Sequence, residues 1–163
     1  MKELLLKYCR FNIWANKKMA EFLSSLKEGE ADKEITSSFS SVRKTVFHMY
    51  GAQELWLKRL NGTSPPSFPA FDSLDFAAAL ELLHETSVQI ATFAESCSEE
   101  ALQKTITYKN LAGQQFTNPI SEILMHVVNH ASYHRGQVIT LLRQLGYQTL
   151  FATDFIAFTR KED

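Results

Sequence analysis

The chain has 163 residues, 45% of them apolar and 21% charged, which predicts one globular domain over residues 1–163 and excludes an intrinsically disordered protein. The formal net charge of −1 gives no electrostatic basis for binding nucleic acid. The sequence holds no run of about 18 apolar residues, so we expect no membrane-spanning helix.

The first two predicted helices cover residues 2–27 and 38–60, where apolar residues recur every three or four positions. Ser40 or Ser41 is the candidate N-cap of the second helix, because a hydroxyl there can accept a hydrogen bond from a free backbone N–H group. His48 lies on the shoulder of the apolar stripe of this helix, about a quarter-turn from its centre.

The third predicted helix covers residues 73–96, with Ser73 as its candidate N-cap. The sequence after this helix no longer favours a helix. Residues 105–108 favour a strand, residues 110–113 favour a turn, and residues 115–117 can return as a second strand. We therefore expect a small extended excursion, or hairpin, before the last long helix.

The fourth predicted helix opens at Asn118-Pro119, an N-cap residue followed by proline at the first helical position. It should continue to about Leu145, with Gly146 as the residue that ends it. The tail, residues 147–163, is too short for another long helix and is predicted to pack across one end of a bundle. Four long helices predict an all-α fold.

Three histidines stand four residues apart on the fourth helix, at positions 126, 130 and 134, and therefore lie on the same side. His130 and His134 border the core face, and His126 lies about 40° further out. His48 is a third shoulder histidine on another long helix. Three neutral imidazoles with an open fourth position are typical of a catalytic metal site. We predict that His48, His130 and His134 bind a divalent metal.

Other interpretations of these residues stay open. A lone histidine on a half-apolar face more often packs in the core than binds metal. Glu81 and His84 fit the Glu-x-x-His pattern of di-iron bundles, but those need a second copy, so a packing or hydrogen-bonding role is favoured for His84. Arg135 could bind an anionic substrate group or an interhelical carboxylate, and the structural role is favoured.

Residues 126–146, HVVNHASYHRGQVITLLRQLG, resemble the C-terminal signature of the DinB/YfiT-like family of metalloproteins. Residues 47–62, FHMYGAQELWLKRLNG, resemble the helix-two signature of that family, and residues 8–19 are similar to its first helix. The resemblance implies an up-down-down-up four-helix bundle, often a homodimer. It also implies a divalent metal, usually nickel or zinc, held by histidines that match the three above.

Family activities include transfer of low-molecular-weight thiols such as bacillithiol, and mycothiol-dependent isomerisation. We therefore predict a metal-dependent enzyme that performs thiol transfer or hydrolysis, with such a thiol as a partner. The metal would act as a Lewis acid or lower the pKa of a bound nucleophile. The catalytic residues stay unassigned, and His126 is a candidate supporting residue beside the metal or a general base. The alternative is a non-enzymatic, metal-stabilised dimeric binding or stress-response module.

Cys9 and Cys97 show no metal or redox spacing, and charges interrupt the apolar run at the N-terminus. These features predict reduced thiols, no signal peptide and a cytoplasmic location.

The apolar arc of the fourth helix is wider than one buried face requires. Val128 and Ile139 point about 160–180° away from His130, whereas a surface helix needs an apolar stripe of about 100°. We therefore predict a homodimer that uses this helix. The competing interpretation is that the first helix or the phenylalanine-rich tail covers the strip within one chain.

Overall fold

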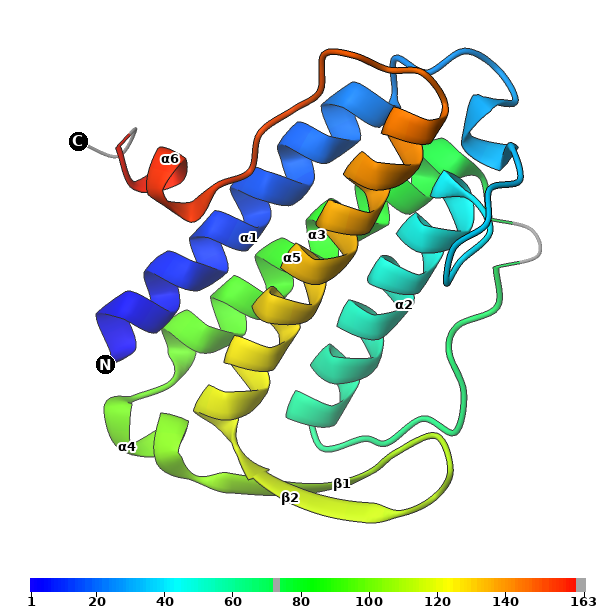
Figure 1. The fold of residues 1–163 in the computed structure, drawn as a ribbon. Helices are drawn as coiled ribbons and strands as arrows, with labels where there is room; N and C mark the ends of the chain where they lie inside the picture. The colour runs from blue at the N-terminus through cyan, green and yellow to red at the C-terminus, as the bar shows by residue number, and fades with distance from the viewer. Residues whose placement is uncertain (72–73, 161–163) are drawn as a thin grey trace.

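Four long helices pack side by side in the computed structural model, which describes residues 1–71 and 74–160 (Figure 1). They are α1 (Lys2–Leu23), α2 (Val42–Leu60), α3 (Phe76–Ser96) and α5 (Ile120–Gln144). Helices α1 and α5 run one way and α2 and α3 run the other, because a long connection returns the chain from the end of α2 to the start of α3 (Figure 1). The predicted all-α, up-down-down-up four-helix bundle is confirmed.

Shorter elements fill the connections. They are the 3-10 helix η1 (Glu30–Asp32), the helices α4 (Glu99–Gln103) and α6 (Phe155–Thr159), and the strands β1 (Thr105–Lys109) and β2 (Gln115–Pro119). The two strands pair antiparallel, with Thr107 opposite Thr117, and their hairpin closes the end of the bundle where α2 ends and α5 begins (Figure 1). This confirms the predicted excursion before the last long helix.

Three helix boundaries differ from the expected ones by a few residues. Helix α1 ends at Leu23, before residue 27. Ser41 caps α2, since its side chain accepts a hydrogen bond from the Lys44 N–H group, so the helix begins after Ser41 and not at residue 38. Asp75 caps α3. The predicted cap, Ser73, lies outside the described residues.

The predicted cap of α5 is wrong by one residue. Asn118 belongs to β2, where it pairs with Ile106, and Pro119 is the N-cap. The hairpin runs directly into the helix, so the strand ladder holds Asn118 in extended conformation. The end of the helix is as predicted: Gly146 has φ +96°, a left-handed conformation that glycine adopts without steric cost.

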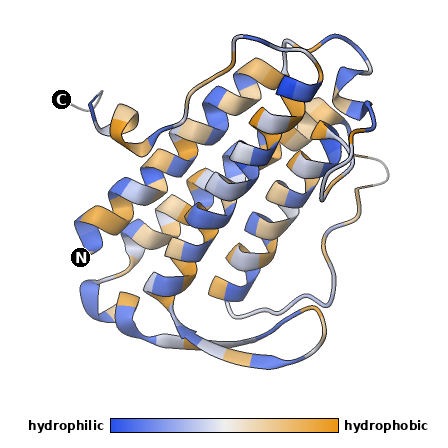
Figure 2. Ribbon diagram, viewed as in Figure 1, coloured by the Kyte–Doolittle hydropathy of each residue, from blue (hydrophilic) through white to orange (hydrophobic). Residues whose placement is uncertain are grey.

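Apolar positions recur along each long helix (Figure 2) and meet in the interior of the bundle. The apolar residues with no exposed surface come from all four long helices: Ala15, Met19, Val42, Val46, Ala79, Leu83, Ala94, Leu124, Val128, Val138 and Leu142. In residues 1–71 and 74–160, no helix is both long enough and apolar enough to cross a membrane.

Helix α5 buries two sides of its surface within the chain. Val128 is fully buried and belongs to the same packed cluster as Leu5 and Phe11 of α1. Ile139 is half-buried. The apolar strip that these two residues were expected to expose is therefore not free, because α5 lies between α1 and α2 and packs against both (Figure 1).

The tail was expected to pack across one end of the bundle. Tyr147 and Phe151 do contact Phe22 at the end of α1, but α6 then packs along the side of that helix. In α6, Phe155 lies with its ring centroid 5.7 Å from that of Tyr8 and 5.2 Å from that of Phe11. Phe158 lies 5.6 Å from Trp14. Short aromatic contacts of this kind anchor a five-residue helix that has too few turns to be stable alone.

Arg135 is fully buried and holds a polar network inside the bundle. Its Nη1 donates hydrogen bonds to Oδ1 of Asn12 at 2.8 Å and to Oδ1 of Asn16 at 2.7 Å. Burial lowers the pKa of the guanidinium to about 10. The rest of the network is Ser132, Gln53 and Ser87, so residues from all four long helices contribute. These contacts support the structural role for Arg135.

Candidate metal centre

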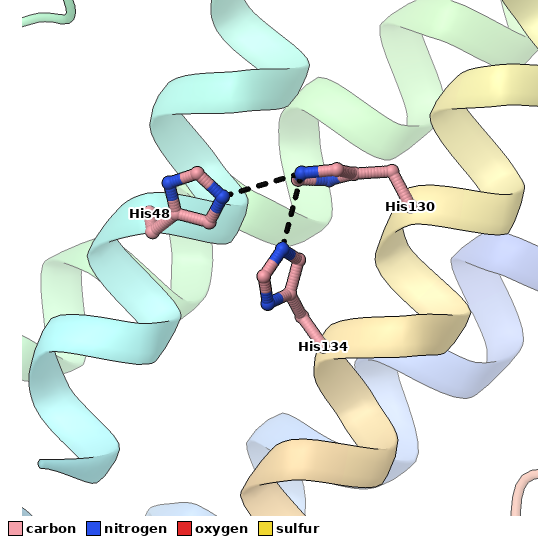
Figure 3. Close-up of side chains that lie close together, drawn as sticks. All are labelled: His48, His130 and His134. Atoms are coloured by element: carbon pink, nitrogen blue, oxygen red, sulfur yellow. Dashed lines mark hydrogen bonds between the residues drawn. The ribbon is translucent and has the colours of Figure 1, made fainter. Parts of the chain in front are cut away.

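The three histidines predicted to bind metal meet between α2 and α5 (Figure 3). His48 extends from α2, and His130 and His134 extend from successive turns of α5. Nε2 of His130 lies 3.2 Å from Nε2 of His48 and 3.1 Å from Nε2 of His134. All three ligand atoms lie within 4.8 Å of one another.

These separations suit a shared metal ion. Zinc binds imidazole nitrogen at about 2.0–2.1 Å, and a tetrahedral arrangement then places two ligand nitrogens about 3.3 Å apart. Each nitrogen of a neutral imidazole has either one proton or one lone pair to share. Nε2 of His130 lies close to the Nε2 atoms of both His48 and His134, so hydrogen bonds alone satisfy this arrangement poorly. Three histidine ligands also leave a fourth position open.

All three imidazoles are held in the neutral form that binds metal. Burial, followed by the nearby His134, lowers the pKa of His48 to about 4. Burial, followed by the neighbouring histidines, lowers the pKa of His130 to about 3. Burial also lowers the pKa of His134, against a hydrogen bond to Gln137 that raises it.

Gln137 selects which nitrogen of His134 faces the centre. Its Oε1 lies 2.7 Å from Nδ1 of His134. An amide oxygen only accepts hydrogen bonds, so Nδ1 carries the proton and Nε2 keeps its lone pair towards the other histidines. The sequence pattern did not single out Gln137, although its position three residues after His134 places it on the same face of the helix.

Two phenylalanines from loops cover one side of the centre. Phe39 stacks on His48 with ring centroids 4.3 Å apart, and Phe68 meets the same ring edge-on at 5.7 Å. Gly51 of α2 makes room for this loop, because a Cβ atom there would lie 2.9 Å from Phe68 and 2.8 Å from Phe71. Neither phenylalanine was predicted, since loops carry no periodic signal.

His126 lies apart from the three ligands, as predicted. It is exposed, with its ring centroid 5.7 Å from that of His130 and 5.0 Å from that of Trp56. Burial of part of the ring and the nearby Arg59 guanidinium lower its pKa, so it is neutral at pH 7. His84 lies on α3 and is not among the clustered ligands.

A model of the DinB family matches residues 1–162. Protein DinB of Bacillus subtilis (strain 168) is 27% identical over 155 residues, which cover 90% of this chain and 89% of that protein. The uncharacterized protein YrdA of the same organism is 28% identical over 130 residues, which cover 77% of this chain and 74% of that protein.

Two solved structures share this fold. One is YfiT from Bacillus subtilis, described as a probable metal-dependent hydrolase with an unusual four-helix bundle topology. It superposes with a TM-score of 0.70 at 15% identity, over 91% of each chain. The other, a DinB-like protein from Bacillus cereus ATCC 10987, gives a TM-score of 0.63 at 18% identity, over 85% of this chain and 89% of that one.

Proposed function

The chain belongs to the DinB family, and from that premise we propose that it is a metal-dependent enzyme whose divalent ion is held by His48, His130 and His134. The observation that supports this proposal is the convergence of three Nε2 atoms at separations typical of ligands on one ion. Such an ion would supply Lewis acidity and lower the pKa of the nucleophile that occupies the open position.

The surrounding residues have distinct tasks in this proposal. The three histidines hold the ion from one side, and Phe39 and Phe68 exclude water from the His48 ring that they cover. His126 is a neighbouring imidazole that is exposed and neutral, and we propose that it moves a proton to or from the reacting molecule.

Two reactions fit the open position. Transfer of a low-molecular-weight thiol to an electrophile is supported by the resemblance to family members with that activity. Hydrolysis is supported by the description of YfiT, whose fold this chain shares. Nickel and zinc both suit imidazole ligands. We propose thiol transfer as the first reaction to test, and ester or amide hydrolysis as the second.

Metal content and turnover should be measured on the same preparations. The native protein should hold one nickel or zinc ion per chain by elemental mass spectrometry, and His130→Ala should hold none. His126→Ala is the matched control on the same helix, and it should keep the metal while losing activity in a thiol-conjugation or hydrolysis screen. Full metal retention by His130→Ala would show that the ligand assignment is wrong.

One observation favours a second candidate function. The aromatic rings over His48 and near His134 make one side of the centre dry, as in a site where metal only stabilises the fold. The chain would then be a metal-stabilised binding or stress-response module. Tight stoichiometric metal with no turnover in either screen would favour this candidate over the enzyme.

A further inference from the structure

An open pocket lies between the end of α2, the hairpin and the start of α5. The pocket has a volume of about 310 Å³, and its lining residues are Trp56, Tyr108, Asn118, Glu122, Ile123 and His126. His126 links it to the metal centre, because its ring centroid lies 5.7 Å from that of His130. The volume is within the range of pockets that hold small organic molecules.

The polar lining of this pocket includes hydrogen-bond acceptors beside the N–H donors of Trp56, Asn118 and His126. The Tyr108 hydroxyl donates to Oδ1 of Asn118 at 3.1 Å, and Nδ2 of Asn118 donates to Oε2 of Glu122 at 3.1 Å. These bonds engage the oxygen of the Asn118 amide and one of its N–H groups. The capacity that remains includes the lone pairs of the Tyr108 oxygen and the second carboxylate oxygen of Glu122. Glu122 is also exposed and carries the single formal charge among the lining residues.

Two aromatic rings also line the pocket. Trp56 and Tyr108 meet edge to face with their centroids 5.0 Å apart, and both are half-buried. Ile123 adds an apolar surface. A carboxylate next to aromatic rings is a combination that suits a cation with an apolar body, because the rings attract positive charge and the carboxylate pairs with it.

Arg59 is a nearby charge that opposes this. Its guanidinium lies 4.5 Å from the centroid of Trp56 and 5.0 Å from that of Tyr108, and it donates to the backbone oxygen of Lys109. A cation that pairs directly with Glu122 gains more than Arg59 opposes wherever it lies closer to the Glu122 carboxylate than to that guanidinium, because Coulomb energy falls with distance.

We propose that this pocket binds the protonated amino group of an organic substrate, which pairs with Glu122 while its apolar body packs against Trp56 and Tyr108. That this molecule is the substrate of the adjoining metal centre rests on the proposed function. It adds the class of that substrate, an amine, and it adds Glu122 as the residue that selects for it.

Three probes of one shape test the proposal: phenethylamine, 2-phenylethanol and 3-phenylpropionate. Each is titrated into protein with and without zinc, and binding is followed by the indole N–H signal of Trp56 in ¹H–¹⁵N spectra, identified by its loss in Trp56→Phe. A carboxylate contact and a cation–π contact together should make the amine bind about 5- to 20-fold tighter than the alcohol. The carboxylate probe should bind most weakly.

The variant Glu122→Gln should lose the carboxylate share of the preference for the amine and keep only the smaller cation–π share, whereas Glu21→Gln, which removes an exposed carboxylate from α1, should keep the full preference. Equal affinities in the native protein, or a preference that is undiminished in Glu122→Gln, would overturn the inference. Metal content, measured separately, tests the proposed function. A chain that binds no metal but keeps the Glu122-dependent preference would refute the metalloenzyme and leave the amine pocket standing.

Discussion

Gln137 orients His134, and removing it should weaken metal binding without removing a ligand. In Gln137→Leu, Nδ1 of His134 loses its acceptor, so the ring can turn or change tautomer. Losses of this type cost about 10- to 100-fold in metal affinity. Zinc affinity is measured by competition with a chromophoric chelator, and the tautomer of His134 is followed by ¹⁵N shifts.

Two variants complete that experiment. Gln137→Glu keeps an acceptor at the same place and should retain the affinity of the native protein or exceed it. Gln144→Leu removes an exposed glutamine from the same helix and should change nothing. If Gln137→Leu binds zinc as tightly as the native protein does, the orientation of His134 is set by something else.

Protons and metal compete for the same nitrogen atoms, so the pKa values set the pH at which metal leaves. Free imidazole, with a pKa of about 6.5, would release metal below that pH. In this chain the pKa of His48 is about 4 and that of His130 is about 3, so protons compete only at lower pH. We expect metal to stay bound at pH 5.5 and to leave as pH approaches about 4, as followed by dialysis and elemental analysis.

The same depressed pKa values predict how the stability of the metal-free protein depends on pH. As pH falls below about 6.5, the unfolded chain binds protons at these histidines and the folded chain does not, so the free energy of unfolding falls. The loss continues as pH falls through the folded values, about 4 for His48 and 3 for His130. Between pH 6.5 and 4.5, the decrease in the free energy of unfolding should be smaller in His130→Ala than in the native protein. Below 4.5 the lowered pKa values of Glu30 and Asp32 add carboxylate effects.

The meeting of these three histidines could be predicted because spacing along a helix fixes direction. A separation of four residues aligned His130 with His134, and the position of His48 on the shoulder of its stripe directed it towards them. Phe39 and Phe68 could not be predicted. Their positions over the centre depend on loop paths, which side-chain periodicity does not specify.

Between elements, the Arg135 network joins all four long helices through polar contacts in an otherwise apolar interior. In Arg135→Met, the buried amide oxygens of Asn12 and Asn16 lose their donor, and each unsatisfied acceptor costs about 1–3 kcal/mol. The free energy of unfolding, measured in urea, should fall accordingly. In the triple variant that also carries Asn12→Leu and Asn16→Leu, part of this loss should be recovered, because the two unpaired amide oxygens are gone while Gln53 Oε1 and Ser87 Oγ lose the asparagine N–H groups that donate to them. A triple variant less stable than Arg135→Met would contradict this account.

At the scale of elements, the predictions depended on length. The long helices repeat their apolar pattern over five or more turns, and all four were predicted. The elements α4, α6 and η1 have five, five and three residues, too few for a 3.6-residue period to appear. The α5 cap was misplaced because Asn-Pro fits the start of a helix as well as the end of a strand, and the hairpin ladder decided between them.

At the scale of the whole molecule, the apolar arc of α5 shows what a single sequence leaves undetermined. A side chain buried by a neighbouring helix and one buried by a second subunit follow the same pattern in sequence. Val128 was expected to lie in a dimer interface, but it is fully buried within the chain, so that expectation is wrong. Ile139 is half-buried, and Ile139→Glu therefore tests the fold more than an interface.

The homodimer stays a prediction, and it now involves another face. Exposed apolar side chains gather where α1, α5 and α6 meet, around a groove of about 230 Å³ lined by Met1, Leu4, Leu5, Tyr8, Met125 and Phe155. Leu4 is 66% exposed, Met125 is 55% exposed and Ile156, next to Phe155, is 58% exposed. Exposed apolar patches commonly mark interaction sites, and a second copy of the chain offers the same apolar surface across a two-fold axis.

Met125→Glu would bury a charge in that interface and should give a folded monomer, with an unchanged helical circular dichroism spectrum. Val88→Glu, at an exposed apolar position of α3, should stay dimeric. Sedimentation equilibrium at micromolar concentration decides: a native monomer refutes the dimer, and a dimeric Met125→Glu places the interface elsewhere.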